Sequence, residues 1–191
     1  MNAFYHSDYF GGGGRWRNEG TIENVICTLK NDITPFSETV LQEAVQNLSK
    51  ILSNDLPDIK QLTRLNNLTV CVVPRAKVNY RPDQLLFKST VQDVVNKLTG
   101  FKDGTDFIIR HTDTRTTHRD RAGFGGNGNL PYPEITKETC GISSDVKDSN
   151  ILLIDDLYTE TVNIDEDAIQ ALLDAGANSV TFYAIGKTVY R

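Results

Sequence analysis

The sequence predicts an α/β fold: a doubly wound, mostly parallel sheet with flanking helices. Apolar, β-branched runs alternate with helical patterns of about 10–15 residues, the order expected of repeated strand–helix–strand units. The run 151–154 is apolar at all four positions, which is typical of a strand covered on both faces. A chain of 191 residues suits one domain, and we therefore expect a single domain over 1–191.

Composition narrows the function classes. The chain is 24% charged and 39% hydrophobic, and no apolar run is long enough to cross a membrane. A net charge of −5 argues against broad binding to duplex nucleic acid, although binding of nucleic acid is not excluded. The first twenty residues carry charges and four consecutive glycines, which is unlike a signal peptide. The three cysteines have no CxxC spacing, so we expect neither a disulfide scaffold nor a structural zinc site, and we expect a cytoplasmic protein.

The first third of the chain predicts an irregular segment and one helix. We expect residues 1–33, with their glycine run and aromatic side chains, to form an irregular hood or flap. Thr34 is the expected helix cap, Pro35 suits the first turn and Pro57 is the expected end. Between them, apolar residues recur at helical spacing, at Leu41, Ala44, Val45, Leu48, Ile51 and Leu52.

The middle of the chain predicts two strands and a helix. Residues 68–73 indicate a buried strand that ends at Pro74, because proline lacks the donor that a central strand needs. A helix follows, with Gly100 as its expected stop and an apolar stripe at Phe87, Val91, Val94, Val95 and Leu98. Residues 106–110 indicate a second strand, and 111–150 a long mobile loop rich in glycine and proline.

The last third predicts strand, helix and strand. After the strand 151–154, Asn163 and Glu166 have the spacing of a capping box that opens a helix. The acidic residues of its first turn suit the positive end of the helix dipole, and they are Asp165, Glu166 and Asp167. Residues 179–185 indicate the final strand.

The strongest functional signal follows the strand 151–154. Two adjacent carboxylates, Asp155 and Asp156, lead into a hydroxyl-bearing turn that opens the helix. In open α/β sheets, ligands bind at the carboxyl ends of strands, and a helix N-terminus attracts anions. Carboxylates beside an anion site suit a ligand with vicinal hydroxyls and a phosphate, and a ribose 5-phosphate fits this description.

This pattern resembles the phosphoribosyl pyrophosphate (PRPP) loop of type I phosphoribosyltransferases, especially the competence-associated and amidophosphoribosyltransferase-like branch. The resemblance covers roughly residues 68 to 191. It implies that Asp155 and Asp156 hold the ribose hydroxyls. It also implies a 5-phosphate loop, which comprises Thr159, Glu160, Thr161, Val162 and Asn163.

The resemblance implies two further loops and a reaction. The pyrophosphate loop would comprise Pro74, Arg75, Ala76 and Lys77. The mobile catalytic loop would supply basic side chains from the run Arg110, Arg115, Thr116, Thr117, His118, Arg119 and Arg121, with Arg115 and Arg119 as catalytic candidates. Phosphoribosyl transfer to a nitrogen acceptor would release pyrophosphate. Mg²⁺ would be the cofactor, held without a dedicated protein cage, and the protein would be a homodimer.

The phosphate loop departs from the family pattern and keeps other functions open. The family's turn has two acidic residues, two variable ones, Thr-Thr-Gly and a hydroxyl residue; here Glu160, Thr161 and Asn163 replace the last three of its characteristic positions. These departures motivate an alternative: a non-catalytic PRPP-fold module, either a ligand sensor or an RNA- or protein-binding regulator. Hydrolysis or lyase chemistry on a ribose phosphate is a third possibility.

Overall fold

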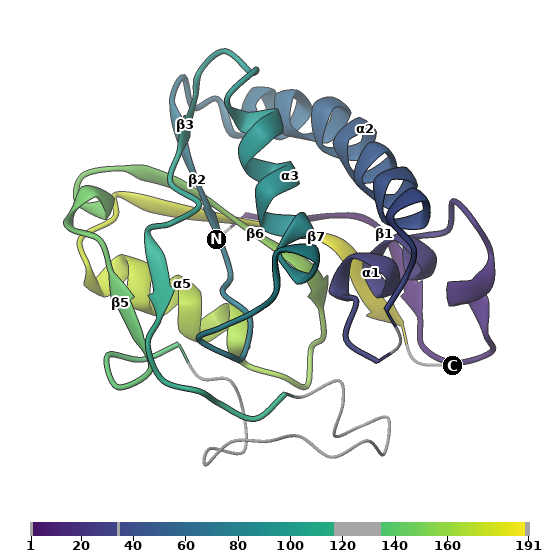
Figure 1. Cartoon of the computed structure of the whole chain (residues 1–191). Helices are drawn as coiled ribbons and strands as arrows, with labels where there is room; N and C mark the ends of the chain where they lie inside the picture. The colour runs from purple at the N-terminus through teal and green to yellow at the C-terminus, as the bar shows by residue number, and fades with distance from the viewer. Residues whose placement is uncertain (1, 34, 117–134, 190–191) are drawn as a thin grey trace.

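A five-stranded sheet, parallel throughout, forms the centre of the molecule (Figure 1). The computed structural model describes residues 2–33, 35–116 and 135–189. In spatial order the strands are β1 (Ala3–Phe10), β7 (Ser179–Val189), β6 (Asn150–Tyr158), β2 (Leu68–Val72) and β3 (Phe101–Asp103). The predicted α/β class with a mostly parallel sheet is therefore confirmed.

Helices cover both faces of the sheet (Figure 1). One face packs against α1 (Ile22–Lys30), α2 (Glu38–Thr63) and α3 (Leu86–Val95), and the other against α5 (Ile164–Asp174). Strand β6 serves both layers: Leu152 and Ile154 belong to the first core cluster, and Ile151 and Leu153 to the second. Because successive side chains of a strand point to opposite faces, a run of four apolar residues is needed where both faces are covered.

The prediction that residues 1–33 are irregular is wrong. They contain strand β1, which pairs with β7, and helix α1, capped by the Thr21 side chain accepting from the Asn24 amide. The aromatic residues Phe4, Tyr5, Tyr9 and Phe10 lie on this edge strand instead of forming a loose flap. The apolar face of α1 is only two turns long, Val25, Ile26 and Leu29 being buried, and so gives a weak periodic signal.

Helix α2 is longer than predicted and begins later. Ser37 caps it, accepting from the Val40 amide, whereas Thr34 lies outside the described residues. Pro57 lies inside the helix, which continues to Thr63, because buried residues on both sides of it keep that segment packed on the core. Within the described ranges, no helix is both long and apolar enough to cross a membrane.

The expected second strand does not join the main sheet. Strand β4 (Ile108–Arg110) pairs antiparallel with β5 (Cys140–Ile142) in a separate two-stranded sheet. Its place beside β2 is taken by the three-residue strand β3, too short to stand out in the sequence. The segment 111–150 is thus partly structured, with β5 and the 3₁₀ turn η3 (Ser144–Val146), while 117–134 lies outside the described residues.

The end of the chain is close to prediction, except for the helix cap. The last strand extends beyond 185 to Val189. Helix α5 starts at Ile164 as expected, but the Asn163 side chain makes no capping hydrogen bond. Glu166 instead accepts a hydrogen bond from the Tyr158 hydroxyl at 3.1 Å. The predicted capping box is therefore absent, because its carboxylate is engaged by the strand.

Candidate ligand-binding site

The sheet topology marks the crevice between β2 and β6 as the expected position of a ligand. From β2 the chain crosses through α3 to β3 on one side, and from β6 it crosses through α5 to β7 on the other. The strand order therefore reverses between β2 and β6, and in open α/β sheets ligands bind outside the carboxyl ends of strands at such a point. The segments after these two strands are the predicted pyrophosphate and phosphate loops.

The two predicted sugar-binding carboxylates do not point the same way. Asp155 contacts Asp165 on α5, whereas Asp156 contacts Lys30 on α1, across the sheet. The regular alternation of side chains also breaks here, since Leu157 joins the core on the α1 side and Tyr158 the core on the α5 side. The sequence suggested convergence of both acids on one sugar; the structure leaves Asp156 as the carboxylate that faces the α1 side of the crevice.

Asp156 forms an ion pair with Lys30, a residue that sequence reasoning did not select. The Lys30 ammonium lies 2.8 Å from both carboxylate oxygens of Asp156. Burial alone would lower the pKa of Lys30, but the carboxylates of Asp156 and then Asp155 outweigh it, and the pKa is raised. The lysine therefore carries a positive charge throughout the physiological pH range.

Asp155, which is half-buried, forms a pair of carboxyl groups with the buried Asp165. Burial, followed by repulsion from Asp156, raises the pKa of Asp155; burial, followed by repulsion from Asp155, raises the pKa of Asp165. Asp165 is only 3% exposed, and its Oδ1 has no hydrogen-bond partner among the described residues. Two carboxyl groups in contact with little water are stable only when they share a proton. Asp165 is thus more than a partner of the helix dipole.

Replacing Asp165 with asparagine is expected to stabilise the protein at alkaline pH. A carboxyl group whose pKa is raised by folding stabilises the folded state below its unfolded pKa of about 4, and this stabilisation is lost as pH rises towards the folded pKa. Asparagine cannot ionise, so in Asp165→Asn the free energy of unfolding no longer falls through the loss of a proton at this position. The side-chain amide can also donate a hydrogen bond to Asp155. Urea unfolding from pH 5 to 9 should give the variant a flatter profile and an advantage on the order of 2 kcal/mol at pH 9.

The matched control for this prediction is Asp174→Asn on the same helix. Its exposed carboxylate accepts from the Gln170 side chain at 2.8 Å, and it lies outside the carboxyl pair. This variant should follow the wild-type pH profile. If Asp165→Asn also follows it, the two carboxyl groups do not share a proton.

The predicted pyrophosphate loop follows β2, and the Arg75 guanidinium in it already binds three protein groups. Its guanidinium donates to Asp32 at 2.6 Å, to the Lys30 carbonyl at 3.0 Å and to the Gln84 carbonyl, and its Cζ lies 4.2 Å from the centroid of the Tyr80 ring. These contacts join the end of α1 to the β2 loop and to the 3₁₀ turn η2 (Pro82–Gln84). Arg75 therefore fixes the walls of the crevice in this conformation.

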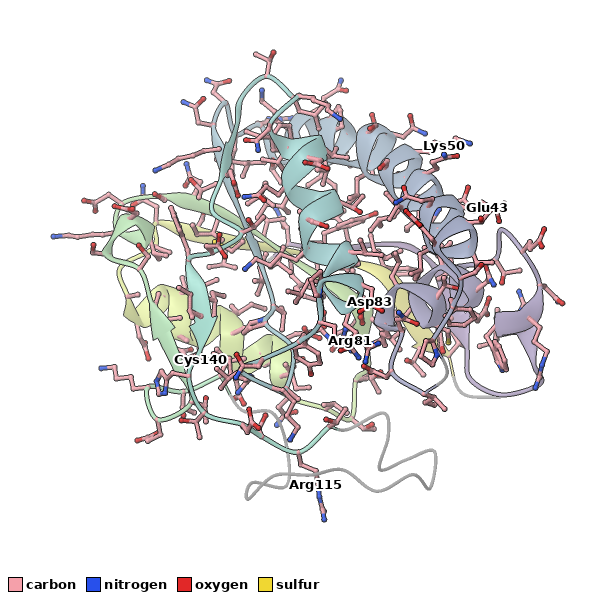
Figure 2. All side chains as sticks on the ribbon, in the orientation of Figure 1. Glu43, Lys50, Arg81, Asp83, Arg115 and Cys140 are labelled. Carbon is pink, nitrogen blue, oxygen red and sulfur yellow. The ribbon has the colours of Figure 1, made fainter. Side chains whose placement is uncertain are left out.

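The end of α1 is the structural centre of these contacts. Asn31 terminates the helix in the left-handed region, with φ of 47°, and is 1% exposed. Its side chain donates to Asp83 at 2.9 Å and accepts from the Phe36 amide at 2.9 Å (Asp83 is labelled in Figure 2). The backbone turn at Asn31 thus sets Lys30 towards β6 and Asp32 towards the β2 loop.

Of the other basic residues that the sequence suggested for the site, some bind the loop after β2 and others lie outside the described residues. Arg110 donates to the Arg75 carbonyl at 2.6 Å, and Lys77 to the Thr114 carbonyl at 2.7 Å, so both hold the loop after β2. The backbone of Ala76 accepts from the Thr114 amide at 2.8 Å. Arg115 extends away from the sheet (Figure 2), and Arg119, with the rest of 117–121, lies outside the described residues.

The predicted phosphate loop is a tight turn between β6 and α5. The Val162 amide donates to the Thr159 carbonyl at 2.8 Å, and the Thr159 hydroxyl bonds that of Thr188 at 2.8 Å. Thr161 does not need the positive φ that glycine would allow, since the non-glycine residues described with positive φ are Asn31, Arg64 and Asp148. Glu160, Thr161 and Asn163 are exposed, so the Glu160 carboxylate is turned to solvent.

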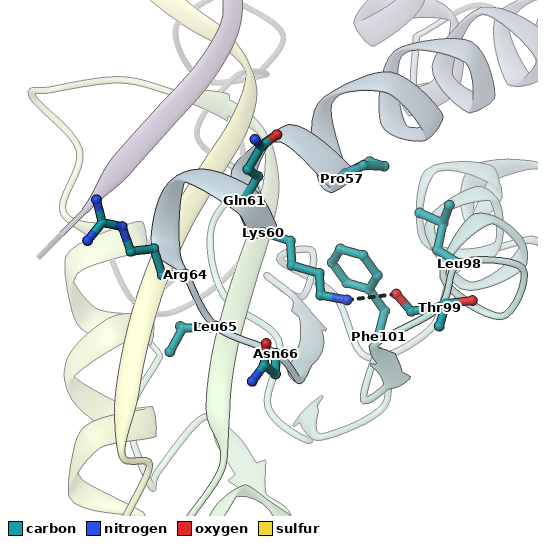
Figure 3. A pocket seen from close by; sticks show the side chains of 9 residues that line it. All are labelled: Pro57, Lys60, Gln61, Arg64, Leu65, Asn66, Leu98, Thr99 and Phe101. Atoms are coloured by element: carbon teal, nitrogen blue, oxygen red, sulfur yellow. Dashed lines mark hydrogen bonds between the residues drawn. The ribbon is translucent and has the colours of Figure 1, made fainter.

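Two cavities lie elsewhere on the molecule. One, of about 530 Å³, is lined by the end of α2 and by the segment before β3, where Lys60 donates to the Thr99 carbonyl at 3.0 Å (Figure 3). The other, of about 430 Å³, lies among β1, α1 and α2 and includes His6, Arg15 and Lys50. Neither of these two cavities is lined by Asp155 or Asp156.

No model of a known protein family matches the chain, and no curated protein matches it. The functional interpretation therefore depends on the contacts described above. Sequence reasoning missed Gln84, and it missed Lys30 and Asp32, which lie far along the chain from Asp156 and Arg75. Lys30 is 126 positions from Asp156, and no local pattern distinguishes a lysine at a helix end that meets a distant carboxylate from one that faces solvent.

Proposed function

We propose that the protein binds PRPP at the crevice between β2 and β6 and transfers its phosphoribosyl group to a nitrogen acceptor with release of pyrophosphate. The observation that carries the proposal is the position of the two predicted loops. They follow the two strands between which the sheet reverses its order, and Asp156 and Lys30 lie beside them. A carboxylate suits sugar hydroxyls, and a cation and the N-terminus of α5 suit phosphate groups.

The chemistry needs positioning more than a strong nucleophile. The acceptor nitrogen displaces pyrophosphate at the anomeric carbon, with positive charge developing on the sugar ring. Carboxylates close to the ring stabilise that charge, and cations stabilise the departing pyrophosphate. In this proposal Asp156 serves the first task and a cation beside the crevice serves the second.

Mg²⁺ fits this site as a partner of the substrate. Among the described residues, no three His, Cys, Asp or Glu side chains are grouped to hold a metal, so its ligands would be mainly substrate oxygens and water, with Asp156 as the residue that would hold it. When bound, the ion would neutralise pyrophosphate charge. The protein's own contribution is to orient the sugar and exclude water from the anomeric carbon.

Calorimetric titration of the protein with PRPP in the presence of Mg²⁺ tests the proposal. We expect saturable binding that is tighter for PRPP than for ribose 5-phosphate, and a thermal stabilisation of about 2.7 kcal/mol at a hundredfold excess over Kd. Pyrophosphate release should then be followed over a panel of bases and amines. Turnover with any acceptor supports a transferase, whereas binding without turnover favours the non-catalytic sensor. Absence of PRPP binding contradicts both.

A further inference from the structure

We propose that Lys30, at the end of α1, binds the pyrophosphate group of the ligand directly. This inference rests on the proposed function and assigns a cation to the site that the sequence motif did not contain. It makes the N-terminal segment, expected to be a loose hood, a third wall of the ligand site beside the loops after β2 and β6.

The surroundings of Lys30 leave one N–H donor for a ligand. An ammonium group has three N–H donors. Its partner among the described residues is the Asp156 carboxylate, and 23% of the Lys30 side chain is exposed. The lysine is thus a partly exposed charged group that a carboxylate orients. A sugar phosphate whose hydroxyls donate to Asp156 also brings its phosphate groups close to this ammonium.

The hydrogen bonds of Lys30 favour the pyrophosphate over the 5-phosphate. Its ammonium pairs with Asp156 on β6 and its carbonyl accepts from Arg75, so Lys30 connects β6 to the predicted pyrophosphate loop. Among the described residues, none of its hydrogen bonds reaches the predicted 5-phosphate loop 159–163. Arg75 is poorly available for this role, because Asp32 and two carbonyls already bind its guanidinium and Tyr80 covers its face. Lys30 therefore replaces it as the cation that meets the leaving group.

The test measures the affinity for magnesium pyrophosphate and for PRPP in four proteins: wild type, Lys30→Met, Asp156→Asn and the double variant. Pyrophosphate has no sugar hydroxyls, so its binding reports the cation separately from Asp156. We expect Lys30→Met to weaken pyrophosphate binding at least tenfold (~1.4 kcal/mol) in both the wild-type and Asp156→Asn backgrounds. The control Lys50→Met removes an exposed lysine of α2 (Figure 2) that lines the second cavity, away from Asp156, and should change neither affinity.

The outcomes separate this inference from the proposed function. If Lys30→Met weakens binding only when Asp156 is present, Lys30 merely positions that carboxylate and the inference is wrong. If the wild type binds PRPP but Lys30→Met binds pyrophosphate as tightly as the wild type does, the inference fails while the proposed function stands. If the wild type binds neither ligand, both are wrong. Urea unfolding of each variant confirms that the folded protein is being compared.

Discussion

Asp156→Asn is expected to weaken PRPP binding at least about 30-fold, on the order of 2 kcal/mol, whereas Asp155→Asn should change it less than about threefold. The two residues are neighbours in the sequence but have different surroundings. Asp156 faces Lys30 and the crevice, whereas Asp155 is turned to α5 and paired with Asp165. Only Asp156→Asn removes a carboxylate that would accept hydrogen bonds from the sugar hydroxyls. Calorimetry with PRPP and Mg²⁺ measures both affinities.

The comparison carries its own control, because both variants replace one carboxylate by an amide of the same shape in the same strand. Equal losses in the two variants would show that the acids converge on one sugar, as the motif alone suggests, and that ligand binding rotates Asp155 away from Asp165. Equal affinities of both variants and wild type would remove Asp156 from the site altogether.

Arg75→Met is expected to be strongly destabilising, by about 3–5 kcal/mol in urea unfolding. The substitution removes an ion pair in which Asp32 is mostly buried, with 9% of its side chain exposed, and leaves that carboxylate without its cation. It also removes the donors to the carbonyls of Lys30 and Gln84. Removing one member of a buried ion pair lowers the free energy of unfolding by more than the intact pair contributes to it. The reason is that the remaining charge is left where water solvates it poorly.

The double variant Arg75→Met/Asp32→Asn separates charge from packing. Asp32→Asn removes the negative charge that Arg75 balances, and we expect recovery of about half of the lost stability. The conservative Arg75→Lys should remain destabilised, because an ammonium cannot reproduce the planar set of donors that meets Asp32 and two carbonyls. A stability loss below about 1 kcal/mol in Arg75→Met would mean that the guanidinium is free, as a pyrophosphate ligand would be.

The sequence predicted those parts of the fold whose signal is contained in a short window. Four consecutive apolar residues in β6 indicated a strand covered on both faces, and the stripe of α3 indicated a helix. The prediction was wrong where the signal was short or its partner distant: β3 has three residues, α1 has two turns, and Pro57 suggested an end that packing on both sides of it overrides. Local propensity is a weak preference that burial of an apolar face can outweigh.

The site divides in the same way. The motif around Asp155 and Asp156 and the proline-containing turn after β2 could be recognised from residue type and order, and the topology brings the two segments to neighbouring strands. The sequence did not show towards which face of the sheet each of the two carboxylates points. Whether a carboxylate faces α1 or α5 depends on the side of the strand that it occupies, and the alternation breaks just beyond Asp156.

The sequence by itself determined the α/β class, the strands β2, β6 and β7, the apolar stripes of α2 and α3 and the residues available for chemistry. Each of these depends on residue type within a few positions. Only the tertiary structure decided which charges meet. Lys30 reaches Asp156, and Asp32 reaches Arg75, across separations of 126 and 43 positions. Such pairs form because folding excludes water from groups that the chain order keeps far apart, and a charge that loses water must find an opposite charge or give up its own.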